Sequence, residues 1–192
     1  MTLFSKTCAG LAFACSCCSF AVAAPKDDLH AAFTKFLAAK TFRATATDVK
    51  KGEQVSKMEF VAPDRYRVDA RGHASLIIGD TMYMDMGGKL TPVPVPGVGK
   101  MVAQYRNPEF LGEMEAGMEV KALGDDSVDG EAAHVYAYTL TRPMKSDAKT
   151  WVSASTGMPI QIESTGTFMG HTATTRVHYS GFDDPSIRID AP

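Results

Sequence analysis

Apolar and polar residues alternate along most of the chain after residue 40. Phe42, Ala44 and Ala46 are apolar, whereas the residues between them are polar. Further strands, most of them with the same period, are predicted over residues 57–62, 65–70, 74–78, 81–86, 119–123, 132–141, 149–154, 158–164 and 172–179. Alternation with a period of two is typical of strands with one apolar face, and the short turns favour antiparallel pairing.

A helical period precedes these strands. Between residues 28 and 40 apolar side chains recur every three to four positions, which is the stripe of an amphipathic helix. The stripe consists of Leu29, Ala32, Phe33, Phe36 and Leu37. Asp27 or Asp28 is suited to cap the start of this helix, and Lys40 suits its last turn.

The alternation breaks near the middle of the chain. Three prolines between residues 91 and 97 lack the N–H donors of a central strand. A short helix is predicted over residues 98–105, ending before Pro108, and the apolar residues that follow keep a helical spacing. The expected fold is mainly β with some α: a strongly curved, open antiparallel half-barrel sheet of about ten to eleven strands, whose concave face is covered by an N-terminal helix and a central helical lid.

The first 23 residues have the features of a secretory signal peptide, with a basic start, an apolar run and an A-x-A end. They contain all the cysteines, namely Cys8, Cys15, Cys17 and Cys18. Cleavage is expected after Ala23, because a cut after Ala24 would place Pro25 next to it. A lipid anchor on Cys15 is disfavoured, because Phe13 fits a lipobox poorly. We therefore expect a periplasmic protein with a single Cys-free domain over residues 24–192.

Composition and motifs exclude several classes of function. A net charge of -2 gives no electrostatic reason to bind nucleic acid. The motifs of a serine hydrolase, a zinc protease and a P-loop are all missing, and residues 97–102 lack the third Gly of a dinucleotide loop. The acidic run 125–130 lacks the Glu of a calcium loop and is better explained as a hairpin turn at Asp129-Gly130. We therefore expect no enzyme, no cofactor and no metal site.

The chain is rich in Met, with eleven in all, and Met82, Met84 and Met86 share one face of a predicted strand. Their thioethers favour an apolar surface that adapts to its contents. Cu(I) binding by this strand is an alternative, because soft ligands select copper.

Several short motifs resemble the superfamily of bacterial periplasmic lipoprotein carriers, which includes the outer-membrane lipoprotein chaperone and receptor and the mycobacterial lipid-binding lipoproteins. The motifs are FVAPDRYRV at residues 60–68, IGDTMYM at 78–84, Trp151-Val152, TGMPI at 156–160, YSGF at 179–182 and IRIDAP at 187–192. The resemblance implies an open curved sheet of about eleven strands, helices over its concave face and an apolar cavity for acyl chains, without catalysis. The carrier member of the family has an Arg that contacts the lid at the position of Ala62 in this sequence.

The leading hypothesis is therefore an exported, monomeric transport or chaperone protein that binds a lipid, an acylated protein or another amphiphile. The residues expected to form the wall and lid of the cavity are Phe33, Phe36, Leu37, Phe60, Tyr66, Val68, Met82, Met84, Met86, Val98, Met101, Val102, Phe110, Leu111 and Ile162. Pro92 to Pro96, followed by Gly97 and Gly99, would act as the hinge of the lid, and the alternative is that these prolines bind a partner as a polyproline II helix. The alternative is an interaction or stress-regulatory factor that binds an envelope membrane protein with the same fold.

Overall fold

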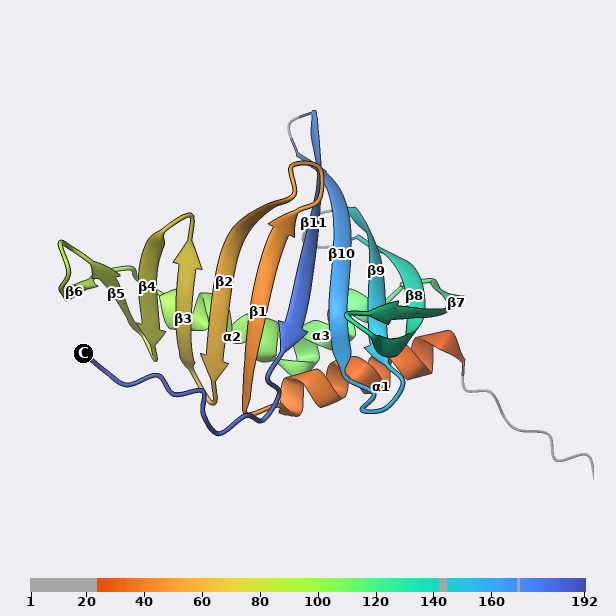
Figure 1. Ribbon diagram of the computed structural model, residues 1–192, viewed down its shortest axis with the longest axis horizontal. Coiled ribbons are helices and arrows are strands. Elements are labelled where there is room, and N and C mark those ends of the chain that lie inside the picture. Colours follow the sequence, from red (N-terminus) through yellow and green to blue (C-terminus); the bar gives the residue numbers. More distant parts are fainter. Residues whose placement is uncertain (1–23, 142–144, 169) are drawn as a thin grey trace, which may run out of the picture.

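A computed structural model describes residues 24–141, 145–168 and 170–192, and the predicted signal peptide lies outside these ranges. Eleven strands form one antiparallel sheet, and helices lie against one of its faces (Figure 1). The first strands are β1 (Thr41–Asp48), β2 (Glu53–Val61), β3 (Arg65–Ala70), β4 (His73–Ile78), β5 (Thr81–Asp85) and β6 (Leu90–Val93). The others are β7 (Val120–Val128), β8 (Glu131–Leu140), β9 (Ser146–Ser153), β10 (Pro159–Phe168) and β11 (His171–Ser180). The helices are α1 (Pro25–Ala38), α2 (Val98–Ala103), the 3-10 turn η1 (Gln104–Arg106) and α3 (Pro108–Glu115).

The sheet consists of two meanders that meet in the middle. Strands β1 to β6 run outward to one edge and strands β7 to β11 return from the other edge, giving the order β6-β5-β4-β3-β2-β1-β11-β10-β9-β8-β7. The first and last strands pair from Arg43–Ser180 to Asp48–Thr175. Helices α2 and α3 belong to the connection that crosses from β6 to β7 behind the sheet (Figure 1).

This architecture confirms the predicted open antiparallel sheet with an N-terminal helix and a central helical insert. The proline-containing stretch forms β6 at the outer edge, where Pro92 needs no ladder donor on its free side. Helix α1 begins earlier than the apolar stripe suggested, because Pro25 suits the first turn and Asp27 and Asp28 also lie there. No helix within the described ranges has the length and apolarity needed to cross a membrane.

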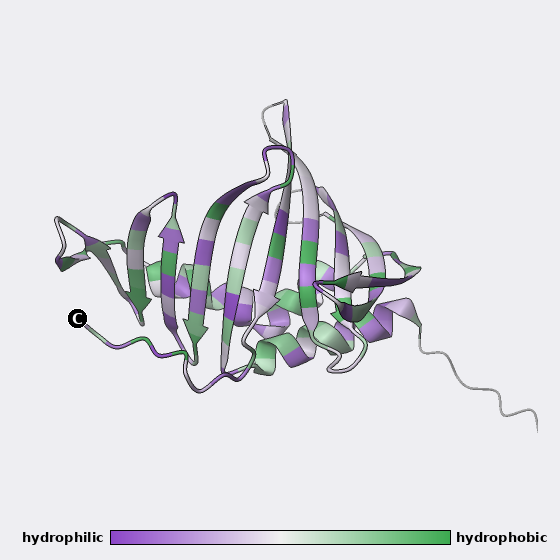
Figure 2. Ribbon diagram, viewed as in Figure 1, coloured by the Kyte–Doolittle hydropathy of each residue, from purple (hydrophilic) through white to green (hydrophobic). Residues whose placement is uncertain are grey.

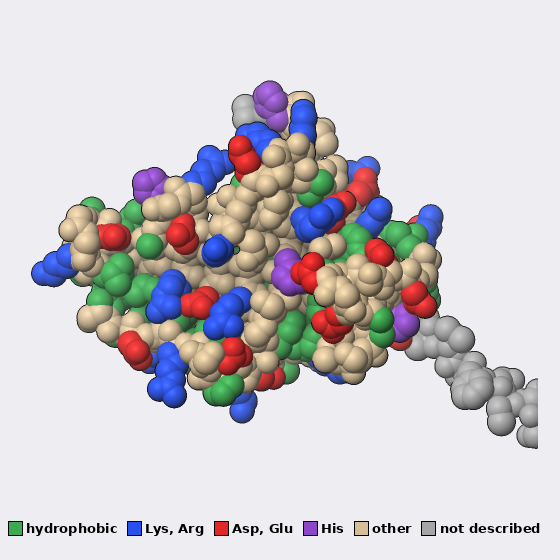
Figure 3. All heavy atoms as spheres, in the orientation of Figure 1, with side chains coloured by type: hydrophobic (Ala, Val, Ile, Leu, Met, Phe, Trp, Pro, Cys, Tyr) green, Lys and Arg blue, Asp and Glu red, His purple; other side chains and the backbone are tan. Residues whose placement is uncertain are grey.

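The outer face of the sheet carries ion pairs that run across strands. Arg43 of β1 and Arg67 of β3 both bind Glu59 of β2, with N–O distances of 3.1 and 2.7 Å. Farther along, Arg176 of β11 pairs with Glu163 of β10 at 2.8 Å. The strands viewed from this side alternate in hydropathy (Figure 2), and basic and acidic side chains are interspersed over them (Figure 3). Over β1–β3 this face is therefore polar, so the apolar side chains of these strands point toward the helices.

Candidate ligand-binding cavity

The core on the helix side of the sheet is divided into two clusters. One surrounds the first half of α1 and consists of Leu29, Ala32, Met118, Tyr136, Tyr138, Ala148 and Val152. The other joins β1 to β4 to the start of the lid and consists of Phe42, Ala44, Phe60, Tyr66, Ile77 and Val98. Partly buried side chains from both clusters face a hollow that also contacts the lid.

This hollow is an apolar cavity of about 410 Å³. Its side chains come from α1, from both halves of the sheet and from the α2–α3 segment, which we call the lid (residues 98–115). The lining residues are Phe33, Phe36, Leu37, Phe42, Met58, Tyr66, Val68, Ile77, Val102, Tyr105, Arg106, Phe110, Leu111, Met114, Met118, Tyr138, Leu140, Ala148, Ile162, Ser164 and Tyr179. Tyr105 is 58% exposed, so it lies at the rim.

The structure gathers many of the residues expected from the sequence around this cavity. These are Phe33, Phe36, Leu37, Tyr66, Val68, Val102, Phe110, Leu111 and Ile162. The others lie elsewhere. Phe60 and Val98 are fully buried in the second core cluster, and Met82 packs against that cluster.

The remaining Met residues lie away from the lining. Met84 is half-buried on β5, whereas Met86 follows the end of that strand and is exposed. Met101 is exposed on the lid. Among the described residues, no group of three or more His, Cys, Asp and Glu side chains is placed to hold a metal ion.

Apart from Ile162, sequence reasoning missed the residues that line the cavity from the second half of the sheet. Tyr138 and Leu140 of β8, Ala148 of β9 and Ser164 of β10 all face it. Alternation along each strand could have predicted them. Tyr138 and Leu140 lie on the same face of β8 as the core residue Tyr136, Ala148 lies on the same face of β9 as Val152, and Ser164 lies on the same face of β10 as Ile162. Arg106 was also missed, since no period in a short helix singles out a polar residue that turns inward.

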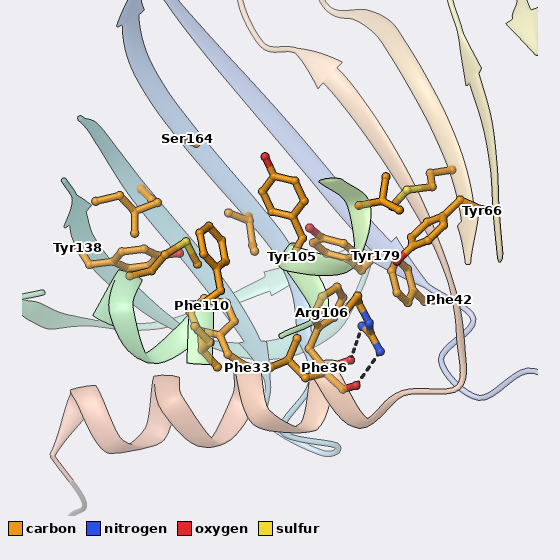
Figure 4. Close-up of a pocket in the computed structure, with 18 of the residues that line it drawn as sticks. Phe33, Phe36, Phe42, Tyr66, Tyr105, Arg106, Phe110, Tyr138, Ser164 and Tyr179 are labelled. Carbon is orange, nitrogen blue, oxygen red and sulfur yellow. Dashed lines mark hydrogen bonds between the residues drawn. The ribbon is translucent and has the colours of Figure 1, made fainter. Parts of the chain in front are cut away.

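Arg106 connects the lid to the end of α1 (Figure 4). Its Nη1 donates to the carbonyl oxygen of Phe36 at 2.9 Å. Its Nη2 donates to the carbonyl oxygens of Leu37 and Ala39 at 2.7 and 2.9 Å. These carbonyls lie at or just beyond the last turn of α1, where the helix dipole favours a cation. The position of the lid over the cavity therefore depends on a residue of the lid itself.

The guanidinium of Arg106 lies against three aromatic rings. Its central carbon is 4.4 Å from the ring centroid of Phe60, 5.2 Å from that of Phe36 and 5.5 Å from that of Phe42. Such contacts are favourable for a partly desolvated cation. Burial nevertheless lowers the pKa of the Arg106 guanidinium from its ordinary value, because the charged form loses solvation. The group stays protonated, as arginine does in proteins.

Tyrosine hydroxyls supply most of the other polar atoms of the lining. The hydroxyl of Tyr66 is buried and has no hydrogen-bond partner among the described residues. Burial raises the pKa of Tyr66, while the nearby charge of Arg106 acts in the opposite direction. Tyr138 shares a 2.8 Å hydrogen bond with Thr150, and burial raises its pKa to about 12. Burial also raises the pKa of Tyr179. These phenols are therefore neutral at physiological pH.

A second set of contacts attaches the lid to the start of α1. Nδ1 of His30 lies 2.7 Å from Oε2 of Glu115, the last residue of α3. Lys26 donates from Nζ to the carbonyl oxygen of Glu115 at 3.0 Å. Together with Arg106, these contacts hold the middle and the last residue of the lid against α1, so the cavity lies between these helices and the sheet.

The fold recurs in solved structures of low sequence identity. No protein-family model matches the sequence, and no curated protein matches it closely enough to serve as a relative. The Mycobacterium tuberculosis lipoprotein LppX superposes with a TM-score of 0.65 at 10% identity, over 86% of this chain and 97% of that protein. LprF from Mycobacterium bovis gives 0.64 at 14% identity, over 88% and 96%. The complex of Pseudomonas aeruginosa MucA and MucB gives 0.46 at 15% identity, over 81% and 56%, which is too partial a match to bear on function. The resemblance seen in the sequence motifs is thus confirmed as a likeness of fold: this chain has the curved sheet and helical cover of the lipoproteins LppX and LprF.

Proposed function

We propose that this protein is an exported carrier or binding protein for a lipid or another amphiphile. The observation that carries the proposal is the apolar cavity between the sheet and the helices. Protein interiors are normally close-packed. An empty hollow lined by apolar side chains leaves them either without packing partners or in contact with water, and both are unfavourable. Such a cavity is best explained by a ligand that fills it.

The size of the cavity supports an acyl chain as that ligand. A methylene group takes up about as much space as a water molecule, about 30 Å³, so the cavity has room for roughly a dozen methylenes. Each methylene removed from water contributes about 0.8 kcal/mol. In this proposal the lid moves aside to admit the chain and closes over the cavity when it is empty, so that its apolar wall is not left in water.

The location of the protein belongs to the same proposal. Residues 1–23 direct export and are removed, and residues 24–192 act as a monomeric single domain in the periplasm. The likeness to two lipoproteins is compatible with work in the cell envelope. No catalytic step is part of this proposal.

A cavity-filling variant tests the proposal. Ser164→Phe places a ring in the cavity from β10, next to Ala148 of β9. We expect this variant to bind the neutral probe N-phenyl-1-naphthylamine at least tenfold more weakly than the parent protein, with an unchanged or higher thermal midpoint, because the ring fills space that is otherwise empty.

The matched control is Lys149→Phe. Lys149 pairs with Glu163, one position away on each strand, so its side chain lies on the opposite face of the sheet and the variant should bind the probe normally. Native mass spectrometry of the purified protein, with extraction of any bound lipid, provides a second measurement. Failure of the parent protein to bind the probe or any added amphiphile would overturn the proposal.

A further inference from the structure

The cavity contains one charged side chain in an otherwise apolar wall. Among its lining residues, which are all described, Arg106 is the only ionisable group besides four tyrosines, and none is Asp or Glu. No ion pair of the described residues involves Arg106. The carbonyl oxygens that it contacts orient the guanidinium, but they carry no net charge to neutralise it.

Arg106 also has more N–H donors than its hydrogen bonds to α1 use. A guanidinium has five N–H groups, and the three hydrogen bonds to the end of α1 leave two of them without an acceptor in the part of the chain that the structure describes. A desolvated cation with free donors is stabilised by an anionic acceptor.

Two tyrosine rings pack against the aromatic rings that contact this charge, and the charge of Arg106 also acts on the Tyr66 hydroxyl. Tyr66 contacts the ring of Phe60, with the centroids 5.0 Å apart, and Phe60 is the ring nearest to Arg106. Tyr179 lies 5.1 Å from Phe36, another ring beneath Arg106. Tyr66 is 6% exposed and its hydroxyl is unpartnered, although a buried hydroxyl without a hydrogen bond is costly. In Figure 4, Tyr66, Tyr179 and Arg106 lie together at one end of the cavity, whereas Tyr138 and Phe110 lie toward the other end.

We propose that the cavity selects single-chain amphiphiles with a carboxylate head, such as long-chain fatty acids, and that Arg106 and the Tyr66 hydroxyl bind the head. The inference rests on the proposed function and names the ligand chemistry of that site. One guanidinium matches one negative charge, and the buried hydroxyl donates the hydrogen bond that it lacks in the empty protein. The acyl chain then extends past Tyr179 and Phe110 toward Tyr138.

The test compares three ligands of equal chain length: laurate, 1-dodecanol and dodecyltrimethylammonium. Each is used to displace N-phenyl-1-naphthylamine from the parent protein, the two ionic amphiphiles below their critical micelle concentrations and the alcohol below its solubility limit. We expect laurate to bind ten- to a hundredfold more tightly than the alcohol, because a hydrogen bond to a charged group is worth that much, and the cation to bind most weakly.

Variants locate the source of the preference. Arg106→Gln should remove most of the laurate preference while alcohol affinity changes little, and Arg106→Lys should restore part of it. The ratio of the two affinities is the readout, since a loosened lid would weaken both ligands alike. Arg67→Gln is the matched control, because it removes the same charge from β3 on the outer face.

Tyr66→Phe gives an independent signature. It should weaken laurate binding three- to tenfold and at the same time raise the thermal midpoint of the empty protein, because an unsatisfied buried hydroxyl is removed. A purely structural role of Tyr66 would not produce these opposite effects.

The outcomes separate the two proposals. Equal binding of all three amphiphiles would overturn the carboxylate selectivity and leave the carrier function standing. A laurate preference that survives both Arg106→Gln and Tyr66→Phe would overturn the assignment of the head site. No displacement by any amphiphile, together with no probe binding, would overturn the proposed function itself.

Discussion

Asp126 and Trp151 link two strands on the face of the sheet opposite the helices. Nε1 of Trp151 donates to Oδ2 of Asp126 at 2.9 Å, and the indole packs with Val128, Val135 and Ile160 in a small separate core. The side-chain hydrogen bond from Trp151, with a further one from the backbone N–H of Ser127, lowers the pKa of Asp126 below its ordinary value. A carboxyl with a lowered pKa in the folded state stabilises that state when it is ionised.

We predict that the fluorescence of Trp151 reports this carboxyl directly, because it is the single Trp of the sequence. The stabilisation is fully present above the usual Asp pKa of about 3.9 and is lost as the pH falls through the lower pKa of the folded protein. A fluorescence titration should therefore show a transition with a midpoint below that usual value. Asp126→Asn should abolish the transition and Asp125→Asn should leave it. An identical titration of Asp126→Asn would show that another group is responsible.

At the scale of elements, the lid is packed onto the sheet through a backbone contact. Helix α2 starts after Gly97, whose φ of 77° lies in the left-handed region. The next Gly, Gly99, lies so close to the β4–β5 turn that a Cβ atom added to it would be 2.6 Å from the carbonyl oxygen of Gly79. A side chain at this position therefore requires the lid to move.

We predict that Gly99→Ala loosens the lid and that Gly112→Ala does not. In α3 a Cβ atom added to Gly112 meets nothing within 4 Å, and Ala is a better helix former than Gly by about 1 kcal/mol. Hydrogen exchange at residues 98–106 should be faster in Gly99→Ala, and the thermal midpoint lower by several degrees, while Gly112→Ala should be unchanged or more stable. Equal exchange rates in the two variants would contradict this role of Gly99.

The elements that the sequence predicted best are those with a strong period. Strict alternation at Phe42 and Ala44 and the helical stripe at Phe33 and Phe36 indicated which faces are apolar, and the structure confirms the sheet and the helices. The lid residues were harder to predict from the sequence, because the position of Arg106 depends on hydrogen bonds to carbonyl oxygens about seventy residues earlier in the chain. Met86 was also hard to predict, because its exposure results from the end of β5 at Asp85 and not from the alternation of the sequence.

At the scale of the whole molecule, the two meanders are joined twice. Pairing of β1 with β11 joins them through the sheet, and the connection that contains the lid joins their outer edges, from β6 to β7. The period of the sequence predicts the strands but not this order, because the pairing of the first strand with the last depends on contacts across more than 120 residues. The position of the cavity follows from this order, since it lies where the two halves meet.

Because the lid belongs to the connection between the two outer edges of the curved sheet, it spans the sheet as a chord spans an arc. Because both ends of the lid are connected to the sheet, we expect the lid to move aside by bending outward between them, and we expect this bending to draw the two edges of the sheet together. We therefore predict that a bound ligand increases the curvature of the sheet. Spin labels on cysteines substituted for the exposed Lys89, beside β6, and Lys121, on β7, should therefore approach each other when laurate binds, whereas labels at Lys121 and Lys149 within one half should keep their distance. An unchanged distance between Lys89 and Lys121 in the saturated protein would contradict this coupling between the ligand and the curvature of the sheet.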